Sequence, residues 1–103
     1  MKLVWSDPAV ADLEAIHHHI GQDSEFYAAG LIAKILEAVE RLADFPHLGR
    51  HVPEAPEDPD VRELLVQSYR VFYRVEAERL LVLAVIHGSR DLSSPELRRR
   101  AVH

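Results

Sequence analysis

The chain of 103 residues is long enough for one domain and too short for two. It contains no cysteine, which excludes a disulfide framework, a thiolate nucleophile and a cysteine-ligated zinc site. The net charge of −5 argues against a dedicated nucleic-acid-binding protein, since such proteins usually carry a basic excess. The charge is uneven: residues 1–60 hold 4 basic and 12 acidic side chains, whereas residues 61–103 hold 8 arginines and 5 acidic side chains.

The chain has no apolar run near the ~18 residues that a membrane span needs. The longest run, residues 80–86, has the length of a strand. The opening Met-Lys-Leu-Val-Trp-Ser-Asp-Pro does not resemble a secretory signal. We therefore expect one cytoplasmic domain, residues 1–103, without membrane contact.

The first half of the chain has the pattern of a strand followed by two helices. Residues 2–5 predict a short strand, and Ser6-Asp7-Pro8 supplies a cap and a first-turn proline for a helix that ends near Gly21. A second helix is expected over about 24–44, because its apolar residues fall on one stripe opposite its charges. The two helices form a predicted hairpin over about residues 8–44.

The second half predicts a loop, a sheet and a tail. Residues 46–60 contain four prolines and are expected to be an exposed connector or a mobile functional loop. Three strands follow within residues 61–88, at 61–67, 69–75 and 80–87. The polar tail, residues 89–103, can start a short helix at Ser94-Pro95-Glu96-Leu97, and we expect the tail to contribute little to folding.

The fold class follows from the apolar run at residues 80–86. A strand that is apolar on both faces usually has neighbours on both sides. The 69–75 strand is one neighbour, and the N-terminal strand is the candidate for the other. The prediction is an α+β fold of two layers, with the helical hairpin packed on one face of an antiparallel sheet. Numbered along the chain, its strands have the order 1-4-3-2.

Because the helices need only one face of this sheet, the other face is expected to be an open apolar patch that includes Phe72 and has arginines around it. Such patches mark partner sites. Arginine suits bidentate pairing with carboxylate or phosphate, so an acidic protein or RNA would fit this surface equally well. The alternative is that the C-terminal tail covers this face.

Residues that could carry chemistry are few. His17-His18-His19 are not expected to bind a metal, because consecutive side chains on a helix point about 100° apart. The sequence has no glycine-rich phosphate loop and no spacing that suggests a Ser-His-acid triad, so we expect no metal and no cofactor. His87, three residues before Arg90, suits a general acid or base in phosphodiester cleavage; the alternative is a histidine with structural contacts alone.

Five segments of the chain, taken together in their order and spacing, are similar to those of a known protein family. These are V-W-S-D-P-A-V-A-D-L-E-A-I at the start, L-A-D-F-P-H-L-G-R-H-V-P-E at the end of the second helix, and V-R-E-L-L-V, Y-R-V-F-Y-R-V and V-I-H-G-S-R-D-L on the three strands. Together they resemble the RelE/ParE superfamily of type II toxins, in particular its ParE branch of plasmid stabilisation proteins. The resemblance spans nearly the whole chain and implies a strand, a helical hairpin and an antiparallel sheet.

The resemblance implies one of two activities. RelE-like members cleave mRNA on the ribosome with basic residues and a general base on the open sheet face, and Arg70 and Arg90 match two of their arginines. Val61 and Glu63 stand where the well-known nucleases carry lysines, and Glu96 stands at the position of their tyrosine. The loss of two cations weakens any site that must stabilise a phosphorane. ParE-like members instead poison DNA gyrase by binding, without known catalytic residues.

We therefore expect a non-enzymatic ParE-like toxin that inhibits DNA gyrase and is neutralised by a cognate ParD-like antitoxin, whose C-terminal segment folds onto it. The toxin alone is not expected to bind nucleic acid sequence-specifically. The residues expected to contact the antitoxin are Arg62, Arg70, Phe72 and Arg74. Those expected to contact the target are Arg90, Arg98, Arg99 and Arg100. The first alternative is a RelE-like ribosome-dependent mRNA endonuclease that uses Arg70, His87 and Arg90; the second is a degenerate, non-toxic interaction module.

Overall fold

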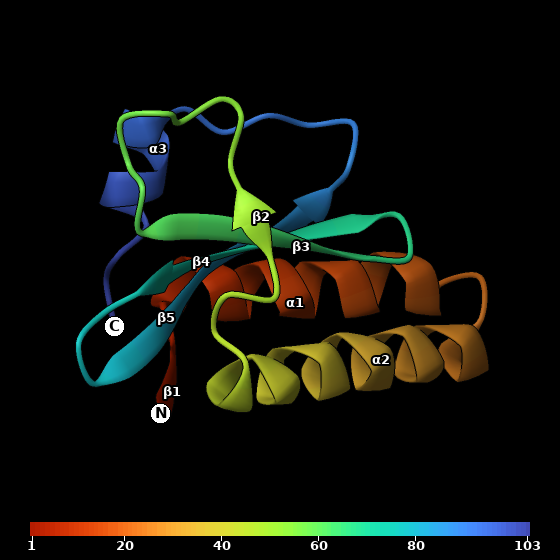
Figure 1. Cartoon of the computed structure of the whole chain (residues 1–103). Coiled ribbons are helices and arrows are strands. Elements are labelled where there is room, and N and C mark those ends of the chain that lie inside the picture. Colours follow the sequence, from red (N-terminus) through yellow and green to blue (C-terminus); the bar gives the residue numbers. More distant parts are fainter.

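The computed structural model describes residues 1–103 as three helices and one five-stranded sheet (Figure 1). In chain order the elements are β1 (Lys2–Trp5), α1 (Asp7–Gly21), α2 (Glu25–Asp44), β2 (Arg50–His51), β3 (Val61–Val66), β4 (Tyr69–Val75), β5 (Arg79–His87) and α3 (Ser94–Arg99). None of the helices combines the length and the apolar composition that a bilayer span requires.

Serine caps define where both long helices begin. The hydroxyl oxygen of Ser6 accepts a hydrogen bond from the N–H of Ala9 at 3.1 Å, and that of Ser24 accepts one from the N–H of Tyr27 at 3.1 Å. Each bond satisfies a backbone donor that has no partner within its helix. The predicted helical hairpin is confirmed, and α2 turns one apolar stripe to the sheet: Ala28, Leu31, Ile35, Val39 and Leu42.

The sheet has the order β1-β5-β4-β3-β2, which confirms the predicted neighbours of the four longer strands. Two details of the prediction are wrong. Strand β1 runs parallel to β5, with Lys2 opposite Arg79, so the sheet is mixed and not purely antiparallel. A two-residue strand, β2, forms within the predicted loop and pairs with Arg62 and Glu63 at the edge of β3.

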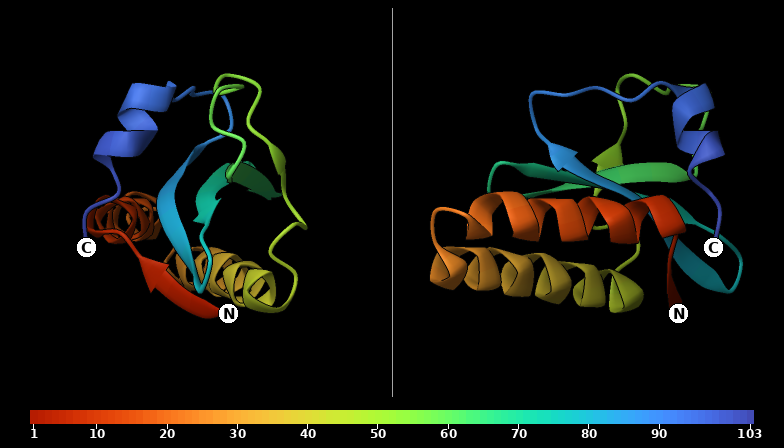
Figure 2. Two further views of the ribbon diagram at one scale, coloured as in Figure 1. Left: turned by 60° about the vertical axis from the view of Figure 1, so that its left-hand side comes forward. Right: turned by 180° about the vertical axis from the view of Figure 1, so that it is seen from behind.

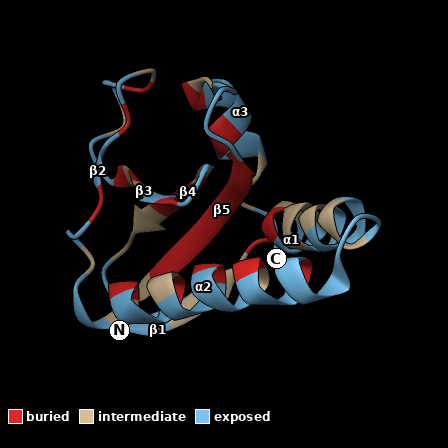
Figure 3. Ribbon diagram, turned by 90° about the vertical axis from the view of Figure 1, so that its right-hand side faces the viewer, coloured by how far each residue is buried: buried red, intermediate tan, exposed pale blue.

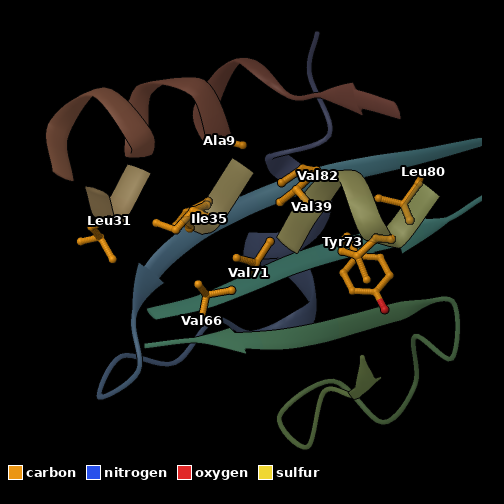
Figure 4. Close-up of a cluster of buried hydrophobic side chains, with 11 residues drawn as sticks. Ala9, Leu31, Ile35, Val39, Val66, Val71, Tyr73, Leu80 and Val82 are labelled. Atoms are coloured by element: carbon orange, nitrogen blue, oxygen red, sulfur yellow. The ribbon is translucent and has the colours of Figure 1, made fainter. Parts of the chain in front are cut away.

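The first core lies between the helical hairpin and the sheet (Figure 4). Its eleven buried residues are Ala9, Leu31, Ile35, Val39, Leu42, Val66, Val71, Tyr73, Leu80, Val82 and Val85. Tyr73 brings a polar group into this core, and burial raises the pKa of its hydroxyl. That hydroxyl accepts a hydrogen bond from the N–H of Gly49 at 2.9 Å and donates one to the carbonyl of Pro46 at 2.8 Å. These bonds fix the start of the 46–60 segment to the sheet.

The opposite face of the sheet is also covered, so the prediction of an open apolar patch is wrong. Two segments, residues 46–60 and 89–99, pack over it; we call them together the cover. In Figures 2 and 3 these segments lie on the side of the sheet away from α1 and α2, and β5 is buried between the two layers. The second core combines cover residues with sheet residues: Val52, Ala55, Leu92 and Leu97 with Val61, Phe72, Leu81, Leu83, Ala84 and Ile86.

The tail is part of the folded structure, which confirms the alternative in which it covers the sheet. The predicted helix at Ser94 is present as α3, and its Leu97 is fully buried. Beyond it, the Nε of Arg100 donates to the carbonyl of Leu83 at 2.9 Å, and the same guanidinium forms an ion pair with Asp12. The expectation that residues 89–103 contribute little to folding is therefore wrong, because the tail fills part of the second core.

Candidate functional site

Arg70 is the most constrained charged residue of the sheet. It lies on β4 beneath the cover, with 5% of its surface exposed. Its guanidinium forms an ion pair with Glu63 and lies 2.8 Å from Glu54 and 3.2 Å from Asp91. It also donates to the carbonyl of Arg90 at 2.7 Å. One buried cation is therefore surrounded by three carboxylates and a carbonyl.

A second arginine completes this group, which we call the Arg70 cluster: Arg50, Glu54, Glu63, Arg70 and Asp91. The side chain of Glu63 is completely buried and accepts hydrogen bonds from Arg50 at 3.1 and 2.8 Å. The hydrogen bond from Arg70 holds the pKa of Glu54 below its usual value, and this effect outweighs the opposing effect of burial. Glu54 therefore acts as an ionised partner of Arg70.

The Arg70 cluster joins both segments of the cover to the sheet. Glu54 belongs to one segment and Asp91 to the other, and both contact the same guanidinium. Two predicted partner contacts are thereby removed from the surface. Arg70 is occupied by its own carboxylates, and Phe72 is fully buried, with the Arg70 guanidinium carbon 4.7 Å from its ring centre.

His87 and Arg90, the other two residues of the predicted nuclease trio, are exposed. Both line a shallow hollow of about 220 Å³ with Tyr69 and residues of α1. The ring of His87 meets that of Tyr69 edge-on, with 5.7 Å between centres, and its Nδ1 accepts the N–H of Ser89 at 3.1 Å. The structure therefore keeps His87 and Arg90 together at the surface and separates Arg70 from them by burial.

The two remaining sheet arginines lie on different faces. Arg62 is opposite Tyr73, whose ring belongs to the hairpin-side core, and donates to the carbonyl of Gly49 at 2.7 Å. Arg74 is opposite Val61, which belongs to the core beneath the cover. Arg62, Arg70 and Arg74 therefore do not form one ring around a single patch.

The four arginines of the tail differ in whether their side chains already form ion pairs or hydrogen bonds within the fold. Arg100 is held by Asp12 and by a backbone carbonyl, so its role is structural. Arg98 lies 3.3 Å from Asp58, in the other segment of the cover. Arg99 is exposed and forms no ion pair or hydrogen bond, and the same holds for the side chain of Arg90. Arg90 and Arg99 are the predicted target contacts that stay available.

The carboxylate partners of Arg70 were not predicted from the sequence. The sequence did contain an indication for Glu63. Strand alternation places Glu63 on the same face of the sheet as Val61, and Glu63 lies opposite Phe72, so it belongs to an inward-facing set of side chains. An acidic residue in such a row needs a buried cation, and Arg70 is on the same face of the next strand. Glu54 and Asp91 gave no such signal, since both lie outside regular strands.

The chain is similar to a family model and to two known proteins. Residues 3–92 match the family model described as "ParE toxin of type II toxin-antitoxin system, parDE". Toxin RelE2 of Caulobacter vibrioides (strain ATCC 19089 / CIP 103742 / CB 15) is 31% identical over 90 residues, which are 86% of this chain and 97% of the relative. Toxin ParE3 of the same strain is 24% identical over 94 residues, 90% of this chain and 92% of the relative.

A solved structure is also similar. It is described as "Chromosomal ParDE TA system from P. aeruginosa", and it superposes with a TM-score of 0.69 at 28% sequence identity. The match covers 84% of this chain and 95% of the solved one, so nearly the whole fold is shared.

Proposed function

Because the chain belongs to the ParE toxin family of type II toxin–antitoxin systems, we propose that it acts by binding and not by catalysis, with DNA gyrase as its target. The observation that carries this proposal is the state of Arg70. This arginine, which matches one of the nuclease arginines, is buried and neutralised by Glu63, Glu54 and Asp91. A cation already paired with carboxylates has little left to stabilise the charge of a phosphorane.

Glu63 strengthens the argument against catalysis. It stands where the nucleases of the superfamily carry a lysine, and its side chain is completely buried between two arginines. A phosphate approaching this position would meet a carboxylate, and like charges at short range repel strongly where water is excluded. The arrangement supports a structural role for this part of the sheet.

The target contacts in this proposal are Arg90 and Arg99. Both side chains are exposed and unpaired, so their guanidinium groups are available to carboxylates or phosphates of a gyrase–DNA complex. Arg98 is a secondary contact because its side chain is 55% exposed, although it pairs with the partly buried Asp58. Arg100 is not among these contacts, because its guanidinium is bound to Asp12 and to the carbonyl of Leu83.

We propose further that a ParD-like antitoxin neutralises the toxin through an acidic, extended segment. Strand β2 pairs with β3 only at Arg62 and Glu63. The edge of β3 from Leu64 to Val66 therefore has no neighbouring strand. Leu65 is 62% exposed at this edge. Arg50, whose side chain is 64% exposed, stands beside it. An unpaired strand edge with apolar and basic flanks suits the addition of an extended acidic peptide; Arg74 stays a predicted contact.

The decisive experiment measures two activities of the purified protein. Supercoiling of relaxed plasmid by gyrase should be inhibited, and mRNA on translating ribosomes should stay intact. Site-specific mRNA cleavage that disappears in His87→Ala and in Arg90→Ala would overturn the proposal in favour of a RelE-like endonuclease. That second candidate is favoured by the likeness to Toxin RelE2 and by the exposure of His87 and Arg90. If the protein shows neither activity and its expression causes no growth arrest, it is a degenerate interaction module.

A further inference from the structure

Three shallow hollows adjoin one another near the end of the molecule where α1 connects to α2. In Figure 1 this connection and the turn between β3 and β4 lie at the same end. The hollows have volumes of about 280, 330 and 220 Å³. Tyr27, Leu31 and Gln67 line both the first and the second, and Tyr69 and His87 line both the second and the third. The hollows therefore form one continuous groove, which we call the tip groove.

The tip groove is rich in aromatic rings. Phe26 and Tyr27, at the start of α2, keep 93% and 58% of their surface exposed, and both line the first hollow. Tyr69 and His87 form the edge-on pair between the second and third hollows. The two α2 rings belong to neither hydrophobic core, so the fold does not account for them. Large exposed apolar groups that share one hollow are typical of a ligand contact.

Unbalanced negative charge is absent from the tip groove, although the chain has 17 acidic residues and a net charge of −5. Asp12 is the only carboxylate that lines the groove, and Asp12 is already paired with Arg100. A cation stands in each outer hollow, Lys34 in the first and Arg90 in the third. Both side chains are exposed, and neither forms an ion pair or a hydrogen bond. The groove is therefore a positively charged region of an acidic protein.

Polar groups lie in the middle of the groove. The two-residue turn between β3 and β4 consists of Gln67 and Ser68, which both line the second hollow. Gln67 has a φ of 55°, the left-handed conformation that such a tight hairpin turn favours. The hydroxyl groups of Tyr27 and Tyr69 form no hydrogen bond within the chain. The groove thus offers amide and hydroxyl groups to a ligand beside its aromatic rings.

We propose that the tip groove binds single-stranded nucleic acid, with bases against its aromatic rings and phosphates near its two cations. Every base has a flat face, so Phe26, Tyr27 and Tyr69 can stack with bases without a sequence preference. Lys34 and Arg90 supply the positive charge that phosphates require. A duplex is a poor occupant, because its bases are already stacked on one another.

This inference goes beyond the proposed function and does not depend on gyrase. The tip groove lies beside the hairpin-side core, to which Leu31 and Tyr69 belong or pack, whereas the Arg70 cluster lies beneath the cover. It requires binding alone, without cleavage and without reading of sequence. Arg90 is shared with the proposed target contacts, so the variants below change residues that only the tip groove uses.

The test uses the full chain, without gyrase or ribosomes, and follows the fluorescence anisotropy of labelled oligonucleotides. The probes are oligo-dT, oligo-U and a DNA duplex, each of about 12 nucleotides, which is within the usual range of single-strand sites. We expect both single strands to bind, and the duplex to bind at least about tenfold more weakly. Two phosphate contacts predict a slope of about −1.4 for log affinity against log salt. A preference between oligo-dT and oligo-U identifies DNA or RNA as the natural ligand.

Matched variants locate the binding site. Tyr27→Ala should weaken the binding of oligo-dT by about fivefold or more, whereas Tyr27→Phe keeps the ring and should weaken it less than about twofold. Phe45→Ala removes a ring that is 61% exposed at the other end of α2, and should leave the affinity unchanged. Lys34→Gln should reduce the salt slope by about 0.7. Lys2→Gln, at an exposed lysine of β1, should not change it.

Three results would overturn the proposal: no saturable binding of either single strand, duplex binding as tight as single-strand binding, or equal affinities of Tyr27→Ala and Phe45→Ala. If oligonucleotides do not bind and Tyr27→Ala weakens the binding of purified antitoxin, the groove belongs to a protein partner. If Tyr27→Ala lowers the melting temperature, the salt slope of Lys34→Gln decides, because Lys34 is exposed and unpaired. Gyrase inhibition is measured separately on the wild-type protein, so either proposal can fail while the other stands.

Discussion

Glu63 on β3 and Arg70 on β4 meet as an ion pair beneath the cover, with 0% and 6% of their side chains exposed. They are not directly opposite in the strand register, since Glu63 faces Phe72 and Arg70 faces Leu65. Their long side chains reach diagonally across the pair of strands. The diagonal brings Arg70 within reach of the two cover segments as well, so one guanidinium joins the sheet to both.

Replacement of Arg70 should therefore be among the most damaging single substitutions. Arg70→Leu leaves Glu63 buried with one partner fewer, and we expect a loss of about 3–5 kcal/mol in the free energy of unfolding. Urea unfolding followed by circular dichroism measures this loss. Arg99→Leu, at an exposed and unpaired arginine, is the control and should change stability by less than about 0.5 kcal/mol.

A double-mutant cycle tests whether the two residues act together. Because each partner is costly to bury alone, Glu63→Gln combined with Arg70→Leu should destabilise the protein less than the sum of the single changes. Strict additivity of the two changes would contradict a direct energetic coupling.

Acid should weaken the attachment of the cover through Glu54. The hydrogen bond from Arg70 holds the pKa of Glu54 below its usual 4.5, so the folded protein binds fewer protons at this group than the unfolded chain. The resulting stability is fully present above the unfolded pKa and is lost as the pH falls through the lower folded pKa. We expect Glu54→Gln to flatten the stability curve below about pH 4.5 in urea unfolding. A curve as steep as that of Glu78→Gln, a change in an exposed turn, would count against this assignment.

Two glycines should respond in opposite directions to the same substitution. A Cβ at Gly49 would lie 2.5 Å from the carbonyl oxygen of Glu63 and 2.6 Å from the Tyr73 hydroxyl, whereas a Cβ at Gly30 would meet nothing within 4 Å. We expect Gly49→Ala to cost about 1–3 kcal/mol through overpacking. Gly30→Ala should gain about 0.5–1 kcal/mol through helix propensity. Thermal melting of both variants checks this, and a shift in the same direction would contradict the packing around Gly49.

The tail should prove essential for folding. Leu97 is fully buried in the second core, so Leu97→Ala should cost about 2–5 kcal/mol. Truncation after Pro95 removes this side chain together with Arg100, and should reduce growth arrest and antitoxin binding alike. A truncated chain that keeps the wild-type melting temperature would contradict the packing of α3.

Toxicity is better tested at side chains that the fold does not use. We expect Arg90→Ala and Arg99→Ala to weaken growth arrest while melting temperature and antitoxin affinity stay close to wild type, because both side chains are exposed and unpaired. Arg100→Ala is the contrasting variant and should lower the melting temperature, since Arg100 bonds to Asp12 and to the carbonyl of Leu83. Full toxicity of the Arg90/Arg99 double variant would shift target recognition to another surface.

The sequence predicted those parts of the fold that periodicity controls. The stripe on α2 and the doubly apolar β5 predicted which faces are buried and which strand lies between neighbours. The direction of β1 was not predictable in this way, because alternation of side chains is the same in parallel and antiparallel pairs. The parallel pairing with β5 needs a long connection, and the hairpin together with β3 and β4 provides it.

The covered face and its charged cluster were missed for a different reason. Val52, Ala55, Leu92 and Leu97 are widely spaced apolar residues in segments rich in proline, serine and acidic residues, so they show no helical or strand period. Arg70 was expected at the surface, among the arginines around an open face. Its burial depends on carboxylates that come from three separate segments, and no local pattern brings these together.

The parallel pairing of β1 also sets when the chain can fold during synthesis. Lys2–Trp5 pair only with Arg79–Val82, and the Ser6 hydroxyl donates to the carbonyl of Leu83, 77 positions later. A nascent chain on the ribosome must therefore expose most of its length before its first strand finds a partner. The helical hairpin needs only neighbouring sequence and can form earlier, but closure of the sheet waits for long-range contacts that are slow to form. We thus expect the domain to acquire its cooperative structure only after β5 has left the exit tunnel.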